Sequence, residues 1–152
     1  MTLHDRSYEV GYASGVYDMF HVGHLNLLRR AREHCRLLVV GVASDEYVEA
    51  LKGARPVIPL SERLDIISSL RIVDEVIVDA SSDKKLAWQT RRFDVIFKGD
   101  DWKDTAKGVQ LESDMRVLGV DVRYFPYTFH TSSTLLRSYI SGQSAPLDQR
   151  AG

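Results

Sequence analysis

The chain has 152 residues, of which 44% are hydrophobic and 27% charged, as is typical of one globular domain with its own core. Its formal net charge of −1 provides no basic field for a nucleic acid or an acidic membrane, so neither is expected as a partner. The chain has a single cysteine, Cys35, no secretory signal, and no apolar run near the roughly 18 residues of a membrane span, which favours a cytoplasmic protein.

Short apolar runs alternate with helical patterns along the chain. In order, we predict a strand at 8–15, a helix at 25–34, a strand at 37–42, helices at 45–51 and 61–70, a strand at 76–78, a helix at 84–92, a strand at 95–97, a helix at 109–118, a strand at 120–125 and a helix at 133–140. Ser61 is predicted to cap the third of these helices, with Glu62 and Asp65 in its first turn.

This alternation predicts an α/β fold, a Rossmann-like three-layer sandwich with a mainly parallel five-stranded sheet. The unbroken runs at 37–42, 76–78 and 95–97 are typical of strands covered on both faces, whereas the alternating pattern at 120–125 favours a place nearer an edge. One domain is expected at 1–142, followed by a flexible tail at 143–152.

Ligands of parallel sheets bind beyond the carboxyl ends of the strands, so a ligand site is expected in the loops after the predicted strands. Four of these loops hold polar residues or glycine. They are Ser14–His24, Ala43–Asp45, Gly99–Trp102 and Pro126–Ser133.

The segment His21-Val-Gly-His24 lies between a predicted strand and a predicted helix. A helix N-terminus attracts anions, and two imidazoles placed there can add donors to a bound phosphate. Gly23 lacks a Cβ and would let a ligand approach the backbone closely. Two alternatives are a helix-capping pair and a metal pair. No cysteine or second histidine cluster completes a tetrahedral set, so no metal ligands are predicted.

Three further segments carry polar side chains near predicted strand or helix ends. Gly99-Asp100-Asp101-Trp102 could hold Mg²⁺ or contact a base or sugar, or could be a turn. Lys52 and Arg63 border a loop with two prolines that could close over phosphates or simply be solvated. The serines at 132–133 could cap the last helix or form a second anion site.

Together these motifs resemble the nucleotidyltransferase superfamily marked by HxGH, and in particular the cytidylyltransferases, over roughly residues 8–140. Gly15–His24 is similar to the first motif of that family, and Lys52 matches its phosphate-binding lysine. Lys98-Gly-Asp-Asp-Trp102 looks most like glycerol-3-phosphate cytidylyltransferase.

The resemblance implies transfer of CMP from CTP to a small phosphorylated alcohol such as glycerol 3-phosphate, giving a CDP-alcohol and pyrophosphate, by a homodimer. Mg²⁺ is expected to accompany CTP, mostly through phosphate oxygens and waters. The implied catalytic residues are His21, His24, Lys52 and Arg63. The implied nucleotide-binding residues are Gly15, Val16, Tyr17, Gly23, Gly99, Asp100, Asp101, Trp102, Thr128, Ser132 and Ser133. The implied substrate-binding residues are Asp18, Asp45 and Arg71.

Two departures from the family pattern leave alternatives open. Tyr127–Ser133 stands where cytidylyltransferases usually carry Arg-Thr-Glu-Gly-Ile-Ser-Thr, and we expect the specificity of this protein to differ there. Leu51–Val57 looks like the adenylyltransferases that activate heptose 1-phosphate, so adenylyl transfer from ATP to a sugar phosphate is the alternative reaction. A non-catalytic nucleotide-binding module is the alternative from another functional class.

Overall fold

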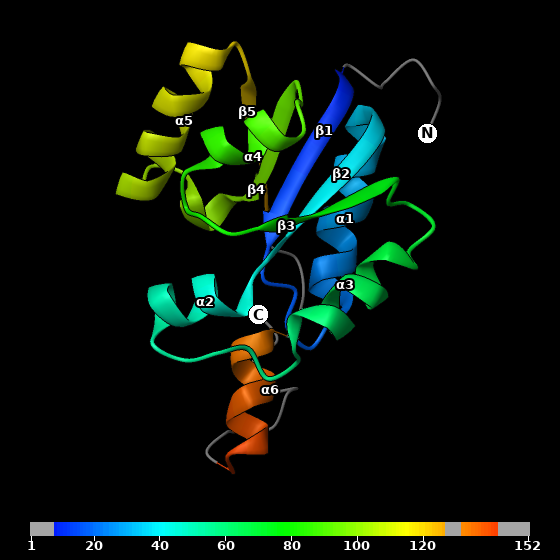
Figure 1. Ribbon diagram of the computed structural model, residues 1–152, viewed down its shortest axis with the longest axis vertical. Helices are drawn as coiled ribbons and strands as arrows, with labels where there is room; N and C mark the ends of the chain where they lie inside the picture. The colour runs from blue at the N-terminus through cyan, green and yellow to red at the C-terminus, as the bar shows by residue number, and fades with distance from the viewer. Residues whose placement is uncertain (1–7, 127–131, 143–152) are drawn as a thin grey trace.

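A five-stranded parallel sheet forms the centre of the computed structural model, which describes residues 8–126 and 132–142 (Figure 1). Its strands follow the order β3-β2-β1-β4-β5, and every neighbouring pair is parallel. They are β1 (Tyr8–Gly15), β2 (Cys35–Ala43), β3 (Glu75–Asp79), β4 (Val95–Gly99) and β5 (Asp121–Phe125). The strand order reverses between β1 and β4, which places the topological switch point beyond their carboxyl ends.

Helices cover both faces of this sheet and its carboxyl edge (Figure 1). They are α1 (Val22–His34), α2 (Asp45–Lys52), α3 (Leu60–Ser68), α4 (Lys84–Thr90), α5 (Ala106–Leu118) and α6 (Ser133–Ile140), with a 3₁₀ turn, η2 (Asp100–Trp102). α1 and α3 cover one face, α4 and α5 cover the other, and α2 and α6 lie beyond the carboxyl ends of the strands. The predicted three-layer α/β sandwich is confirmed.

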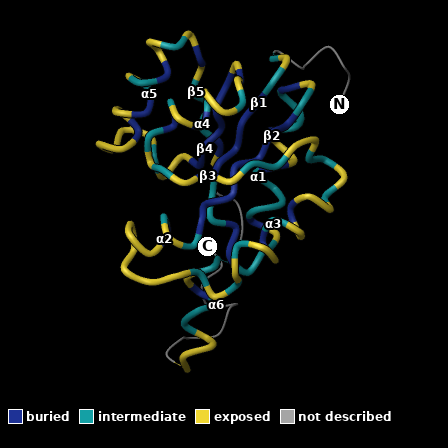
Figure 2. The backbone as a smooth tube through the Cα atoms, viewed as in Figure 1, coloured by how far each residue is buried: buried dark blue, intermediate teal, exposed yellow. Residues whose placement is uncertain are grey.

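Two apolar clusters lie on the two faces of the sheet, and the strands between them are the most buried part of the backbone (Figure 2). Leu28 and Ala31 of α1 pack with Val40 and Phe97 on one face. Tyr12 and Ile96 pack with residues of α4 and α5 on the other. Side chains alternate along a strand, so each strand supplies both cores with successive residues.

The sequence predicted the position of one edge strand of the sheet but not that of the other. The alternating strand β5 is an edge, as predicted. The prediction that residues 76–78 are covered on both faces was wrong, because β3 is the opposite edge and Val78 is 47% exposed. A run of three β-branched residues indicates a strand but carries no information about how many neighbours it has.

Two helices begin earlier than the apolar pattern predicted. α1 starts at Val22, so His24 lies within its first turn rather than before it. α3 starts at Leu60 with Pro59 at the N-cap, so the prediction that Ser61 caps it was wrong. Pro59 holds the extended N-cap conformation without any side-chain hydrogen bond. The predicted tail at 143–152 lies outside the described residues. Among the residues that the structure describes, no helix is long and apolar enough to cross a membrane.

Candidate active site

The two histidines of the first motif close a reciprocal cap on α1. His21 is the N-cap residue, and its Nδ1 accepts a hydrogen bond of 3.1 Å from Gly23 N. His24 Nδ1 in turn accepts a hydrogen bond of 3.3 Å from His21 N. The capping alternative is therefore confirmed, and it engages the Nδ1 atom of each ring.

This cap fixes the chemistry of the remaining ring nitrogens. Because Nδ1 accepts, a neutral ring carries its proton on Nε2 and presents a donor there. Burial, and then the charge of His21, lowers the pKa of His24 to about 3, and partial burial also lowers the pKa of His21. The two rings stack with centroids 3.9 Å apart. Near neutral pH the pair consists of uncharged hydrogen-bond donors at a helix N-terminus.

The loop that leads into α1 is strained and anchored. Tyr17 and Met19 have positive φ angles of 55° and 49°, a conformation that side chains other than glycine seldom adopt. The Tyr17 hydroxyl donates to Ala13 O at 3.2 Å, and its ring lies 5.4 Å from that of His24. A Cβ on Gly15 would lie 3.0 Å from the Tyr17 ring, so a residue with a side chain there would push this ring aside.

Asp18 holds this loop to two distant segments. Its carboxylate accepts hydrogen bonds from Val57 N and Ile58 N at 2.8 and 2.9 Å. Arg137 donates to it at 3.2 Å, and the Ser133 hydroxyl donates to Asp18 O at 2.6 Å. The resemblance implied a substrate contact for Asp18, but the side chain is buried and engaged with the protein. These contacts are those of a positioning residue, and the implied substrate contact stays a prediction.

Arg63 is likewise a buried connector. It is only 1% exposed, and its guanidinium donates to the carbonyls of Val16, Ala43 and Ile58, each at 2.8 Å. Nη2 donates to Asp45 Oδ1 at 2.7 Å. Arg63 lies in α3, within the predicted helix, and ties together three loops at the carboxyl edge rather than being solvated. Its implied contact with phosphate stays a prediction. Asp45 is partly exposed and keeps a place beside this edge.

Lys52 and Arg137 form a cationic rim at the same edge. Lys52 is the exposed last residue of α2. Partial burial, followed by the positive charges of Arg137 and Lys107, lowers its pKa, so these cations lie within electrostatic reach of one another. Asp18 lies near enough to act in the opposite direction. A cluster of like charges beside a helix N-terminus favours a polyanionic ligand.

The segment after β4 is a 3₁₀ turn, as its turn alternative proposed. Asp100 and Asp101 are exposed within η2, and Trp102 is half-buried at its end. Throughout the described ranges, no three His, Cys, Asp or Glu side chains gather as a metal site would require. Gly99 precedes the turn as the last residue of β4, so the segment does reach the carboxyl edge.

The sequence matches the family described as Cytidylyltransferase-like over residues 12–139. The chain belongs to this family. It is 39% identical to the bifunctional protein HldE of Rhodospirillum rubrum over 132 residues, which cover 84% of this chain and 26% of that protein. It is 44% identical to the ethanolamine-phosphate cytidylyltransferase of Arabidopsis thaliana over 95 residues, covering 59% of this chain and 22% of that enzyme.

Among solved structures, the lipopolysaccharide core biosynthesis protein from Thermoplasma volcanium is similar to this chain, with a TM-score of 0.67 and 30% identity. The match covers 79% of this chain and 98% of that one. By contrast, the chain spans about a quarter of the length of the first curated relatives that it matches, 22% to 26%. The likeness to those longer proteins therefore concerns one part of them.

Not every residue implied by the family pattern reaches the site of this family member. Ser132 caps α6 by accepting from Leu135 N at 3.0 Å, as predicted, and with Ser133 it lies at the carboxyl edge. Arg71 lies between the end of α3 and the start of β3, at the amino end of the sheet, so one chain does not bring it beside the histidine pair. Its implied substrate contact stays a prediction. Thr128 lies outside the described residues.

Sequence reasoning missed two buried lysines at the carboxyl edge. Lys98 ends the apolar run of β4, and Lys84 begins α4 as the partner of Asp79 at 2.6 Å. The only signal was a lysine directly after a strand that reads as covered on both faces. That pattern requires the charge to be either buried or aimed at a ligand.

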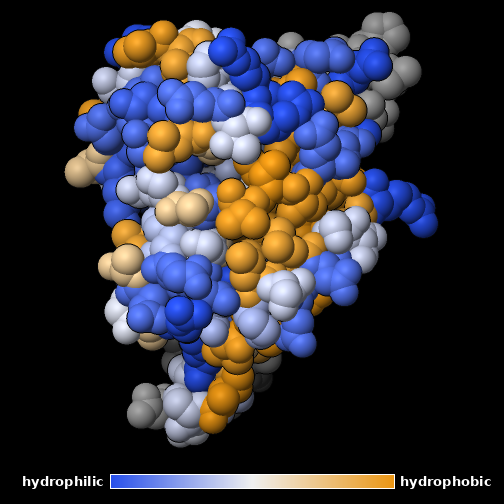
Figure 3. Space-filling model, in the orientation of Figure 1, coloured by the Kyte–Doolittle hydropathy of each residue, from blue (hydrophilic) through white to orange (hydrophobic). Residues whose placement is uncertain are grey.

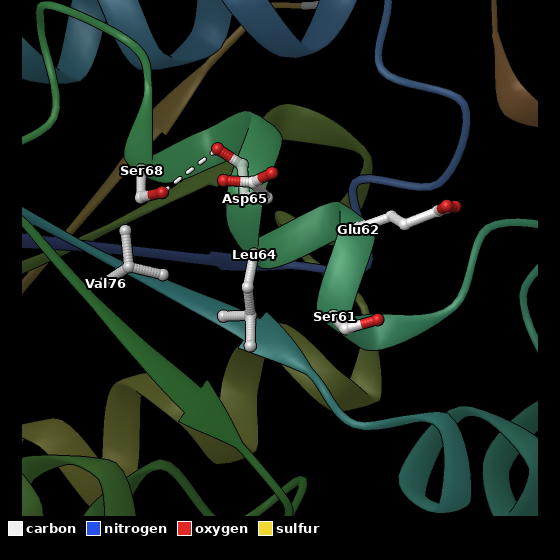
Figure 4. Close-up of a pocket in the computed structure, with 6 residues that line it drawn as sticks. All are labelled: Ser61, Glu62, Leu64, Asp65, Ser68 and Val76. Carbon is white, nitrogen blue, oxygen red and sulfur yellow. Dashed lines mark hydrogen bonds between the residues drawn. The ribbon is translucent and has the colours of Figure 1, made fainter.

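Two cavities lie near these elements. One, of 590 Å³, lies between α3 and the edge strand β3 (Figure 4). Its lining residues are Ser61, Glu62, Leu64, Asp65, Ser68 and Val76. The other, of 640 Å³, lies at the carboxyl ends of β2 and β3 and is lined by Ser44, Glu46, Tyr47, Ala50, Leu51, Ala80, Ser81 and Ser82. The second adjoins the carboxyl edge, which also carries the histidine pair.

Proposed function

We propose that this protein transfers CMP from CTP to the phosphate of a small phosphorylated alcohol and releases pyrophosphate. The observation that carries the proposal is the neutral histidine pair capping α1 at the switch point of the sheet. Membership of the Cytidylyltransferase-like family and the similarity to an ethanolamine-phosphate cytidylyltransferase support the choice of reaction.

In the proposed reaction, an oxygen of the acceptor phosphate attacks the α-phosphorus of CTP. A bond forms between that oxygen and phosphorus, while the bond from the α-phosphorus to the bridging oxygen breaks and the electron pair leaves with pyrophosphate. A phosphate monoester has a second pKa of about 6, so it is already an anionic nucleophile near neutral pH. The protein needs to supply no general base, only position and charge stabilisation.

The residues of the site divide into those that contact phosphate and those that hold them. Nε2–H groups of His21 and His24 donate to phosphate oxygens as negative charge develops, and Lys52 adds a mobile positive charge. The N-terminus of α6, after Ser132, offers backbone N–H groups to the terminal phosphates. Asp18, Arg63 and Asp45 act through the loops that they join.

Mg²⁺ is expected to enter with the nucleotide. The exposed carboxylates of Asp100 and Asp101 do not form a closed ligand set, which fits an ion held mainly by phosphate oxygens and waters. When bound, the ion would shield the negative charge of the triphosphate. The protein side chains would then contribute hydrogen bonds rather than most of the metal ligands.

A homodimer remains part of the proposal. Figure 3 shows apolar side chains gathered over β3 and α3, and Val78 and Ile66 are exposed there. An unpaired strand with apolar neighbours is a common place for subunit contact. Size-exclusion chromatography with light scattering should give twice the chain mass, and a monomer at micromolar concentration would contradict the dimer.

Adenylyl transfer from ATP to a sugar phosphate is the second candidate. It is favoured by the resemblance of Leu51–Val57 to adenylyltransferases of heptose 1-phosphate and by the similarity to a lipopolysaccharide core biosynthesis protein. The hydroxyl-lined cavity at Ser44, Tyr47 and Ser81 is compatible with a sugar. The nucleotide distinguishes this candidate from the first.

A panel of nucleotides and acceptors tests both candidates. Pyrophosphate release should be measured with CTP, ATP, GTP and UTP against glycerol 3-phosphate, phosphocholine, phosphoethanolamine and sugar 1-phosphates. The first candidate predicts turnover with CTP and an alcohol phosphate, and turnover with ATP and a sugar phosphate would establish the second. Nucleotide binding by calorimetry without pyrophosphate release from any pair would contradict both and favour a non-catalytic module.

A further inference from the structure

A row of polar side chains crosses the carboxyl edge on the face covered by α4 and α5. Ala13 of β1 pairs with Phe97 of β4, so the next residues, Ser14 and Lys98, are neighbours on the two strands. Side chains alternate along strands, which puts both on the same face as Tyr12 and Ile96. This is the face opposite the one on which α1 packs.

Lys98 carries a buried positive charge without a hydrogen-bonding partner among residues 8–126 and 132–142. Its side chain is only 9% exposed, and Nζ lies 4.1 Å from the centroid of the Trp102 ring. An aromatic face attracts a cation, but this contact does not replace the hydrogen bonds that an anion would accept from the ammonium. An ammonium in such surroundings gains most from an oxyanion placed within its reach.

Ser14 provides the second donor beside it. The hydroxyl is buried, and none of the described side chains or backbone groups forms a hydrogen bond with it. A buried hydroxyl left unpaired costs free energy unless a ligand or water forms a hydrogen bond with it. Two neighbouring strands therefore present an unpaired hydroxyl and an unpaired ammonium on one face.

The third part of the row is the ion pair of Lys84 and Asp79. Because Asp79 is already paired with Lys84, the row as a whole has a net positive charge. Lys84 Nζ lies 2.6 Å from Asp79 Oδ2, and the Tyr12 hydroxyl donates to the same oxygen at 3.1 Å. Asp79 is thus shared between Lys84 and Tyr12, and its charge is already matched by one lysine. Burial, and then the charge of Lys84, lowers the pKa of Lys98 to about 7, as expected for an ammonium without its own counter-ion.

We propose that Lys98 and Ser14 bind the phosphate of the acceptor substrate, which is the phosphate monoester of a polyol or sugar. This inference rests on the proposed nucleotidyl transfer and names the acceptor side of that site. The Nζ ammonium and the hydroxyl would hold two oxygens of the phosphate and leave the third to attack.

The position of the pair favours the acceptor over the nucleotide. The histidines cap α1, whose Leu28 packs on one face of the sheet, whereas Lys98 and Ser14 lie on the other face at the same edge. Attacking and leaving oxygens lie in line across the transferred phosphorus. Phosphates held on opposite faces of β1 would approach the α-phosphorus from opposite sides.

The neighbouring cavity indicates the rest of the acceptor. Lys84 donates to Ser81 O at 3.0 Å, and its Nζ lies 5.3 Å from the Tyr47 ring centroid, so the 640 Å³ cavity adjoins this row. Four of the residues that line it carry hydroxyl groups, namely Ser44, Tyr47, Ser81 and Ser82. Such a lining suits a hydroxylated acceptor better than a quaternary ammonium, which several aromatic faces would bind.

Trp102 makes the proposal directly measurable. The chain contains two tryptophans, so Trp88→Phe leaves Trp102 as the only one. Its fluorescence should be titrated with inorganic phosphate and with glycerol 3-phosphate, and with sodium chloride at equal ionic strength. Lys98→Met removes the charge at similar volume. Lys103→Met is the matched control, because Lys103 directly follows Trp102 but is exposed.

We expect a saturable change with both phosphates, with affinity at least about tenfold lower in Lys98→Met and unchanged within about twofold in Lys103→Met. Ser14→Ala should weaken binding about threefold or more, and it carries the test if Lys98→Met does not fold. Equal affinity in wild type and in the folded Lys98 or Ser14 variant would overturn the subsite. So would an equal loss in Lys103→Met, or a fluorescence change no larger than that with chloride.

The same variants separate this inference from the proposed function. In the pyrophosphate assay, Lys98→Met should raise the KM for the acceptor about tenfold and leave the KM for the nucleotide within about twofold. If no pair of substrates releases pyrophosphate while phosphate binding still depends on Lys98, the proposed function fails and the anion subsite stands. If pyrophosphate is released with unchanged acceptor KM in Lys98→Met, the subsite fails alone.

Discussion

The carboxylate of Asp18 accepts a hydrogen bond from Arg137 at 3.2 Å, although the two residues lie 119 positions apart. The same carboxylate receives two backbone N–H groups from the loop before α3. One buried side chain thus joins the histidine loop, the loop after α2 and helix α6, which are the three segments proposed to surround the nucleotide.

Asp18→Asn should weaken this junction while keeping the shape of the side chain. We expect the free energy of unfolding to fall by about 1–3 kcal/mol, because charge-assisted hydrogen bonds become neutral or unpaired. Turnover should fall about tenfold or more through misplacement of the histidines. Thermal denaturation and steady-state kinetics measure the two effects. Glu9→Gln, in an exposed pair with Arg36, is the control and should change neither.

Arg63→Lys should be far more harmful than its conservative appearance suggests. A lysine cannot reproduce the hydrogen bonds of the guanidinium to three carbonyls and Asp45, so buried acceptors would be left unpaired. The expected loss is about 3–5 kcal/mol in the free energy of unfolding. Arg55→Lys, in exposed pairs with Glu49, is the matched control, with an expected change under about 0.5 kcal/mol in urea denaturation. Equal stability of the two variants would contradict the connector role.

The buried His24 should make the protein less stable in acid. Burial lowers the pKa of His24 to about 3, below its value of 6.5 in the unfolded chain, so the unfolded state binds the proton more readily. Stability therefore falls as pH drops through about 6.5 and levels off below about 3, by at most about 1.4 kcal/mol per pH unit. Urea denaturation from about pH 7 to 4 should show a smaller loss in His24→Gln. An identical loss in both proteins would exclude this cause.

Above neutral pH, acceptor binding should weaken as Lys98 loses its proton. The pKa of Lys98 is lowered to about 7 by burial and Lys84, while Asp79 and Asp101 act against this shift and Lys107 adds to it. The acceptor phosphate is fully ionised above about pH 7, so a rise in acceptor KM between about pH 7 and 9 reports the lysine. Lys98→Arg stays charged and should flatten the profile. A profile that is unchanged in Lys98→Arg would point to another group.

The sequence located the histidine pair because strand, glycine and helix signals coincide there, and a helix N-terminus has a definite chemistry. It also placed Ser132 at a helix cap, where hydroxyl residues have a known preference. Spacing could not show whether Arg63 is exposed or buried, because burial depends on loops that meet only in the folded chain. Likewise, Val78 became exposed through the position of β3 at the sheet edge, which is a property of topology and not of local pattern.

Lys98 is a second residue whose burial and neighbours the sequence could not predict. The sequence pattern of Gly99–Trp102 indicated a ligand role for the two aspartates, which are exposed. The lysine before this segment instead lies in the buried strand, with its Nζ over the Trp102 ring. Only the pairing of β1 with β4 puts it beside the hydroxyl of Ser14. The register between two strands decides which of their residues become neighbours, and a short stretch of sequence does not specify that register.

The central proposal is that His24 stabilises charge on the transferred phosphate, and the kcat of two variants tests it most directly. His24→Ala removes both cap and donor, whereas His24→Gln keeps an acceptor suited to the capping box. With the best substrate pair from the panel, both variants should lose about 10² or more in kcat, while His24→Gln melts closer to wild type than His24→Ala does. Near-wild-type kcat in either variant would contradict the proposed role of the histidine pair.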